Sequence, residues 1–69
     1  MAVNYYVNDV AQPNGDHEVH RDGCQFMPSA PNRTYLGYFE LCVQAVREAK
    51  RYHRQVNGCF YCSLPCHTS

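Results

Sequence analysis

The end of the sequence gathers side chains that bind soft metal ions. Four potential ligands fall within nine residues of this 69-residue chain: Cys59, Cys62, Cys66 and His67. A second pair, His20 and Cys24, lies far upstream. A core of this size supplies only about 3–5 kcal/mol of net stability, so small scaffolds commonly add a metal or disulfides. These residues therefore constrain the fold more strongly than any other feature of the sequence.

The spacing favours one tetrahedral zinc site formed by His20, Cys24, Cys59 and Cys62. Two short-spaced ligand pairs separated by a long segment are a common plan for structural zinc. Because the pairs are far apart in the chain, one ion would tie the N-terminal strands to the C-terminal tail. The spacing does not decide among three further candidates that could replace a ligand or serve a second site: His17, Cys66 and His67.

Thiol chemistry is the alternative interpretation of the same residues. Cys-x-x-Cys is also the thiol–disulfide motif, in which a helix N-terminus lowers the pKa of one thiol. Here the motif follows the C-terminal end of a predicted helix, and that end of the dipole disfavours a thiolate. A redox or metal-responsive protein that uses Cys59, Cys62 and Cys66 remains the alternative function, and a disulfide from Cys24 to Cys59 or Cys62 remains an alternative pairing. The five cysteines cannot all pair within one chain.

The rest of the chain predicts strands and one helix. Residues rich in β-formers predict strands at 3–7, 17–20 and 33–39, with Gly37 marking a bulge or a close backbone approach. An apolar stripe at helical spacing predicts a helix over 40–53. Cys42 lies on this stripe, where we expect a small core hydrophobe. We expect Asn57-Gly58 to end the helix in a left-handed turn and His53 to be a solvated cap.

These elements predict an α+β fold in a single small domain spanning 1–69. We expect two or three antiparallel strands with one helix packed across them, closed by the metal-ligand tail. Such an arrangement places both ligand pairs where the small core most needs support.

Charge and motifs limit the classes of function. Six basic residues balance six acidic ones, so no strong field steers the chain to nucleic acid or to an anionic membrane. No glycine-rich phosphate loop or hydrolase signature is present, so we expect no enzyme activity. The best interpretation is a zinc-stabilised binding module for a protein or a nucleic acid. The sequence determines neither the partner nor the oligomeric state.

The N-terminal residues lack the basic and apolar regions of a signal peptide. No apolar run approaches the ~20 residues that a transmembrane helix needs. We therefore expect a cytoplasmic protein without a membrane partner. In that compartment thiols stay reduced, so clustered cysteines indicate metal ligands rather than structural disulfides.

The order of these motifs also resembles known proteins. The pattern His20-x-x-x-Cys24, then a strand, a helix and Cys59-x-Tyr61-Cys62-x-x-x-Cys66-His67 is similar to a set of small bacterial proteins without an assigned activity. The resemblance covers about residues 17 to 67. It adds an expectation about the fold unit and none about activity.

More distantly, the plan resembles the zinc-binding module of the bacterial alkylation-damage sensor Ada. That resemblance implies zinc, with His20, Cys24, Cys59 and Cys62 as its ligands. In the Ada module one zinc thiolate accepts a methyl group from DNA phosphotriesters. Here the first ligand is His20 rather than a cysteine, and the strong basic charge that would deliver DNA is lacking. The architecture and the metal are therefore carried over as expectations, and the methyl transfer is not.

Overall fold

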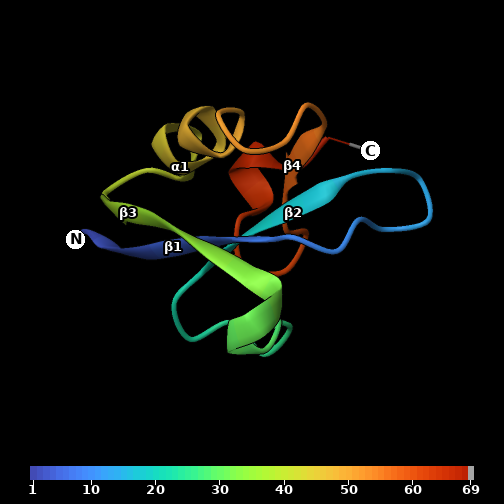
Figure 1. Cartoon of the computed structure of the whole chain (residues 1–69). Helices are drawn as coiled ribbons and strands as arrows, with labels where there is room; N and C mark the ends of the chain where they lie inside the picture. The colour runs from blue at the N-terminus through green and yellow to red at the C-terminus, as the bar shows by residue number, and fades with distance from the viewer. Residues whose placement is uncertain (69) are drawn as a thin grey trace.

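The computed structural model, which describes residues 1–68, is a four-stranded sheet with one helix on its upper face in Figure 1. The elements are β1 (Val3–Asn8), β2 (His17–Arg21), β3 (Arg33–Phe39), α1 (Cys42–Ala49) and β4 (Val56–Gly58), with 3-10 turns at Ala30–Asn32 and Leu64–Cys66. The strand order is β3-β1-β2-β4. The α+β class is confirmed. Among residues 1–68 no helix has the length and apolar character needed to cross a bilayer.

The sheet differs from the expected one in strand number and direction. β1 pairs antiparallel with β2 and β3, but β4 pairs parallel with β2, with Val19 opposite Gly58. The expectation of two or three antiparallel strands is therefore wrong, because β4 is too short to carry a periodic pattern. The expected left-handed stop at Asn57-Gly58 is also wrong, because both residues belong to β4 and Gly58 has no positive φ.

Close packing explains the glycine at position 58. A Cβ added there would lie 2.7 Å from the carbonyl oxygen of Ser63 and 2.8 Å from the carbonyl carbon of Cys66. Only a residue without a side chain lets the C-terminal tail fold back against β4 at this distance. The glycine thus marks where the tail closes on the sheet.

β3 contains the expected irregularity. Tyr5 pairs with Gly37 and Tyr6 with Tyr35, so Leu36 is an extra residue on β3. Its side chain is buried in the core. Gly37 has φ +140°, and a Cβ there would lie 2.7 Å from the ring of Phe39. Gly37 therefore serves both the bulge and a close approach.

α1 is shorter than the predicted helix over 40–53. It begins at Cys42, where the Gln44 side chain accepts a hydrogen bond from the Leu41 N–H at 3.1 Å. After Ala49 the chain tightens into a turn, with Tyr52 N–H donating to the Ala49 carbonyl. His53 is not the expected solvated cap. Its Nε2 lies 2.8 Å from Asp9 Oδ1, and its ring stacks on His17 at 3.7 Å.

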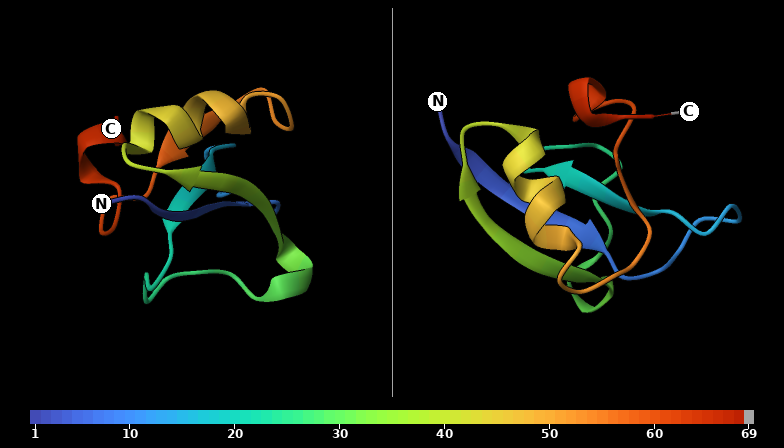
Figure 2. Two further views of the ribbon diagram at one scale, coloured as in Figure 1. Left: turned by 90° about the vertical axis from the view of Figure 1, so that its left-hand side faces the viewer. Right: turned by 90° about the horizontal axis from the view of Figure 1, so that it is seen from above.

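The core lies between α1 and the sheet and contains few large side chains. The buried cluster consists of Tyr5, Val7, Val19, Leu36, Cys42, Ala45 and Ala49. α1 covers one face, and residues 22–32 lie on the opposite side of the strands (Figures 1 and 2). Side chains of β2 are therefore buried in both directions: Val19 is fully buried and its neighbour His20 is 1% exposed. That second buried face contains the site described next.

Candidate metal site

Four side chains from three places in the chain converge beside β2. His20 lies on β2, Cys24 in the turn after it, and Cys59 and Cys62 in the segment directly after β4. Their potential ligand atoms all lie within 4.8 Å of one another. This Cys/His cluster could hold a metal ion.

The dimensions of the cluster suit a tetrahedral ion. Cys24 Sγ and Cys62 Sγ lie 3.6 Å and 3.8 Å from His20 Nδ1, and Cys24 Sγ lies 4.0 Å from Cys59 Sγ. Zinc bonds of about 2.3 Å to sulfur and about 2.0 Å to nitrogen place ligand atoms about 3.5–3.8 Å apart at the corners of a tetrahedron. The separations therefore require little movement to surround one ion.

The turn after β2 places Cys24 beside His20. The Cys24 N–H donates to the Arg21 carbonyl at 3.1 Å, which closes the turn. Gly23 has φ +89°, a left-handed conformation that favours glycine. No neighbour lies within 4 Å of a Cβ built at Gly23, so backbone conformation rather than space selects this glycine.

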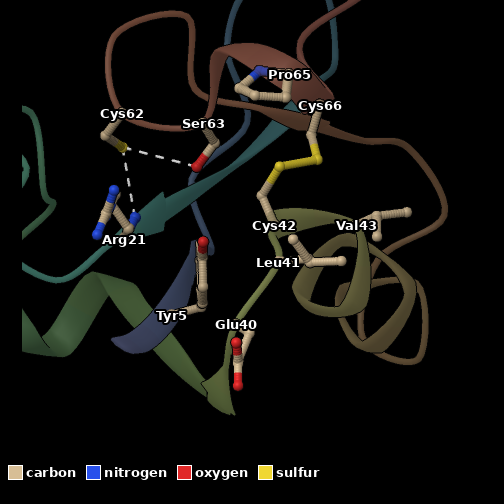
Figure 3. A pocket seen from close by; sticks show the side chains of 10 residues that line it. All are labelled: Tyr5, Arg21, Glu40, Leu41, Cys42, Val43, Cys62, Ser63, Pro65 and Cys66. Atoms are coloured by element: carbon tan, nitrogen blue, oxygen red, sulfur yellow. Dashed lines mark hydrogen bonds between the residues drawn. A yellow bond between two sulfur atoms is a disulfide. The ribbon is translucent and has the colours of Figure 1, made fainter. Parts of the chain in front are cut away.

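Backbone hydrogen bonds position the other two thiols. The Cys59 N–H donates to the Val19 carbonyl at 2.9 Å and so extends the pairing of β4 with β2. The Ser63 N–H donates to the Cys59 carbonyl at 2.9 Å, which closes a turn around Cys62. The Arg21 N–H in turn donates to Cys62 Sγ at 3.4 Å (Figure 3). N–H groups directed at sulfur stabilise the thiolate form.

Burial keeps part of the cluster neutral in the absence of a cation. His20 and Cys59 are each 1% exposed. Burial raises the pKa of Cys62 to about 12, with the Cys24 and Cys59 thiols adding to the shift and the Arg21 N–H opposing it. Burial also lowers the pKa of His20. A neutral imidazole is already in the ligand form, whereas the crowded thiols need a cation to ionise together.

The second nitrogen of His20 points toward a carboxylate. Nε2 is buried and has no hydrogen-bond partner among residues 1–68. Glu18, two residues earlier on the same face of β2, places its Oε1 3.7 Å away. Metal-bound histidines usually donate their other N–H to a carboxylate or carbonyl. Glu18 is thus the carboxylate nearest to this N–H and was not singled out from the sequence.

The three alternative ligands lie outside the cluster. His17 Nδ1 contacts the Asn8 carbonyl at 3.0 Å, and the ring stacks on His53. His67 Nδ1 contacts the Gly58 carbonyl at 3.0 Å. Cys66 forms a disulfide with Cys42. Alternation along β2 places His17 and His20 on opposite faces, which the sequence pattern itself indicates, whereas the positions of Cys66 and His67 depend on the path of the tail.

The Cys42–Cys66 disulfide corrects two expectations. Cys42 is buried in the core as expected, but it is not a free packing residue. The view that cysteines here indicate metal ligands rather than structural disulfides is wrong for this pair. The bond forms because Leu64–Cys66 folds back onto the first turn of α1, a contact between residues 24 apart in sequence. Cys24, Cys59 and Cys62 remain as free thiols, so neither alternative disulfide from Cys24 forms.

Exposed aromatic rings flank the cluster. Phe26 lies two residues after Cys24, and Phe60 and Tyr61 lie between Cys59 and Cys62. The Phe26 and Tyr61 rings are 4.5 Å apart, and the Phe60 and Tyr61 rings are 5.2 Å apart. All three side chains are about half exposed or more. We call this surface the aromatic cluster.

Fold and site together define a small α+β protein with a Cys3His cluster that could hold a metal ion. Comparison with family models, curated proteins and solved structures finds no match to this chain.

Proposed function

We propose that the chain is a non-enzymatic binding module whose fold is closed by one zinc ion held by His20, Cys24, Cys59 and Cys62. The convergence of these four ligand atoms within 4.8 Å carries the proposal. Three thiolates and an imidazole form a soft donor set that suits zinc and excludes magnesium and calcium. All four positions come from protein side chains, which is typical of structural rather than catalytic zinc.

The small core supports a structural role for the ion. Three of its seven buried residues are alanine or cysteine, which bury little apolar surface. The disulfide ties the tail to α1, and the ion would tie the tail to β2 and its following turn. The two cross-links thus supply stability that the burial of apolar side chains in this small core does not provide.

Glu18 would orient the imidazole. If Nδ1 is the ligand atom, the ring proton resides on Nε2, the buried atom that lacks a partner. A carboxylate that accepts this proton selects the tautomer and makes the imidazole a stronger donor. Glu18 is 3.7 Å away, so a small side-chain movement would bring it into hydrogen-bond distance.

The aromatic cluster is the surface that we assign to binding. Exposed Phe and Tyr side chains grouped on the two ligand turns are typical of interface cores. The zero net charge favours a protein partner over nucleic acid, whose backbone demands basic side chains. The thiol-redox alternative lacks a specific observation in its favour, since Cys66 is paired with Cys42 and burial keeps the Cys62 thiol protonated.

Native mass spectrometry of the protein purified without added metal tests the zinc proposal. We expect the mass of the chain plus one zinc, with two hydrogens missing for the disulfide. Cobalt exchanged into the site should show tetrahedral d–d absorption that Cys24→Ser abolishes and Ser29→Ala, a matched surface change, retains. A folded, metal-free protein that binds neither ion would overturn the proposal.

Cross-linking in extracts of the source organism tests the assignment of the aromatic cluster. The double variant Phe60→Ser, Tyr61→Ser should lose the cross-linked species that the wild-type protein forms and should keep its zinc. Tyr52→Ser removes an equally exposed aromatic side chain outside the cluster and serves as the control. Capture of the same species by the double variant would rule the cluster out as the interface.

A further inference from the structure

The Cys42–Cys66 disulfide joins two sulfur atoms that lie in unlike surroundings. Cys42 is 9% exposed at the start of α1, whereas Cys66 is partly exposed in the 3-10 turn Leu64–Cys66. Both residues border a cavity of about 320 Å³ that opens beside the bond (Figure 3). A small molecule can therefore approach the bond from the Cys66 side while the chain stays folded.

The position of Cys42 in α1 favours its thiolate form. Cys42 is the first of the eight residues of this helix, where the helix dipole stabilises a negative charge. Leu41, which precedes it, has no side-chain acceptor to cap the helix. Among residues 1–68 no backbone carbonyl accepts a hydrogen bond from the N–H of Cys42 or Val43. A thiolate at Cys42 would lie beside these uncapped N–H groups.

The other electrostatic effects on Cys42 are opposed to one another. Arg21 and Glu40 both border the cavity, and they carry opposite charges. One favours a thiolate and the other disfavours it. Burial also disfavours a charge on Cys42, but the cavity leaves one side of the residue open. The helix terminus is therefore the effect that distinguishes Cys42 from Cys66.

The tail has a second attachment that remains when the disulfide opens. Cys59 and Cys62 lie in the ligand cluster with His20, and the Cys59 N–H donates to the Val19 carbonyl at 2.9 Å. Zinc in this cluster would hold the tail on β2 while Cys66 is free. This expectation rests on the proposed function. The reduced protein would then keep its fold, so that the bond can open and close reversibly.

The reducing compartment expected from the sequence also bears on this bond. Thiols in such a compartment mostly stay reduced, and the disulfides that form there are usually transient and catalytic or redox-sensing. Cys42 and Cys66 nevertheless pair in the structure. A reversible bond is consistent with both.

We propose that Cys42–Cys66 is a redox-active disulfide that exchanges with small-molecule thiols. An attacking thiolate bonds to Cys66 Sγ, the bond between the two cysteines breaks, and Cys42 leaves as a thiolate. A second thiolate then attacks the sulfur of the first, which forms a small-molecule disulfide and releases Cys66. Two electrons pass to the protein, and the two protons lost by the attacking thiols are gained by Cys42 and Cys66. The exchange is stoichiometric and goes beyond the binding role proposed above.

Reduction of the native zinc-loaded protein with dithiothreitol, in the presence of excess zinc, tests the proposal. Samples are quenched with acid, denatured and alkylated, and peptide mass spectrometry counts free Cys42 and Cys66. We expect both thiols to appear while circular dichroism shows an unchanged fold, and to pair again when oxidised glutathione is added. Reduction only in denaturant, or reduction that unfolds the protein, would show a purely structural bond and overturn the proposal.

Zinc content measured in the same samples separates this proposal from that of the metal site. Reversible exchange in a folded protein that binds no zinc would contradict the zinc proposal and support this one. Bound zinc with a bond that resists dithiothreitol would do the reverse.

Single-cysteine variants identify the sulfur that is attacked. Cys42→Ser leaves Cys66 unpaired, and Cys66→Ser leaves Cys42 unpaired. In variants that circular dichroism shows to be folded, oxidised glutathione should modify Cys66 about tenfold faster than Cys42, because Cys42 is buried. Equal rates, or a faster reaction at Cys42, would contradict attack at Cys66.

The role of the helix terminus is tested at Leu41, whose side chain is exposed. Leu41→Asp places a negative charge beside Cys42 and should slow reduction about two- to fivefold relative to Leu41→Asn, which has the same shape without the charge. Val10→Asp and Val10→Asn form the control pair at an exposed position outside the cavity, and their rates should be equal. Equal rates for the two Leu41 variants would show that Cys42 does not leave as a thiolate.

Discussion

The disulfide from Cys42 to Cys66 joins the first residue of α1 to the last residue of the 3-10 turn Leu64–Cys66. Cys62, four residues before Cys66, instead lies in the cluster with His20. Neighbouring cysteines in the tail thus serve two different cross-links. This division uses all five cysteines, two in the disulfide and three as free thiols of the cluster.

Thiol counting checks this division. Denatured protein treated with iodoacetamide plus chelator should gain three adducts, at Cys24, Cys59 and Cys62, and five adducts once the disulfide is reduced. In the native zinc-loaded protein these three thiols should be alkylated much more slowly, because metal and burial withhold the thiolates. Peptide mass spectrometry gives both counts. Five adducts before reduction would contradict the disulfide.

Removal of the disulfide should affect stability and not metal affinity. The double variant Cys42→Ala, Cys66→Ala opens a loop of 24 residues in sequence separation, which costs about 3 kcal/mol of the free energy of unfolding. Denaturant unfolding measures the loss, and competition with a zinc chelator should show an unchanged affinity. Cys59→Ser is the contrasting variant, because it should lose the metal. Loss of zinc from a double variant that circular dichroism shows to be folded would place Cys66 among the ligands.

Glu18→Gln should weaken zinc binding by about tenfold or more, because the carboxylate partner of a metal-bound histidine is lost. Glu18→Asp should recover part of the affinity if it can reach His20 Nε2. Chelator competition provides the measurement. Glu48→Gln is the control, because Glu48 pairs with Arg51 on the helix surface. Equal affinities for Glu18→Gln and Glu48→Gln would exclude Glu18 from the site.

Gly58→Ala should lower the free energy of unfolding by about 1–3 kcal/mol, because a new Cβ meets backbone atoms that cannot move aside alone. The nearest is the Ser63 carbonyl oxygen at 2.7 Å. Gly23→Ala tests a different cause, since its Cβ meets no atom within 4 Å and only the positive φ is strained. Thermal unfolding compares the two. An unchanged free energy of unfolding in Gly58→Ala would show that the tail is not held against β4.

Acid should weaken the contact between Asp9 and His53. Burial tends to raise the pKa of Asp9, but hydrogen bonds to His53 and Thr34 outweigh it and lower the pKa below 3.8. A carboxylate with a lowered pKa in the folded state contributes stability above pH 3.8, and this is lost as pH falls through the lowered value. Asp9→Asn should therefore flatten the acid limb of the stability curve. Parallel curves for both proteins would show that Asp9 contributes nothing to the loss of stability at acid pH.

Local patterns in the sequence predicted most of the individual elements. β1, β2 and β3 follow runs of β-formers, and Gly37 marks the bulge. The extent of α1 was overestimated because helical spacing continues to His53, whereas the chain turns after Ala49 so that His53 reaches Asp9. Such a boundary depends on a contact between residues 44 apart, which local periodicity does not contain.

By itself the sequence determined the α+β class and the two short ligand pairs, His20 with Cys24 and Cys59 with Cys62, because strand patterns and short ligand spacings are local properties. Only the tertiary structure decided the fourth strand, the pairing of Cys42 with Cys66 and the meeting of the two ligand pairs at one site. Each of these depends on the path of the tail, which turns back against β4 at Gly58. That path is selected by close packing between distant segments, and short-range sequence patterns do not predict it.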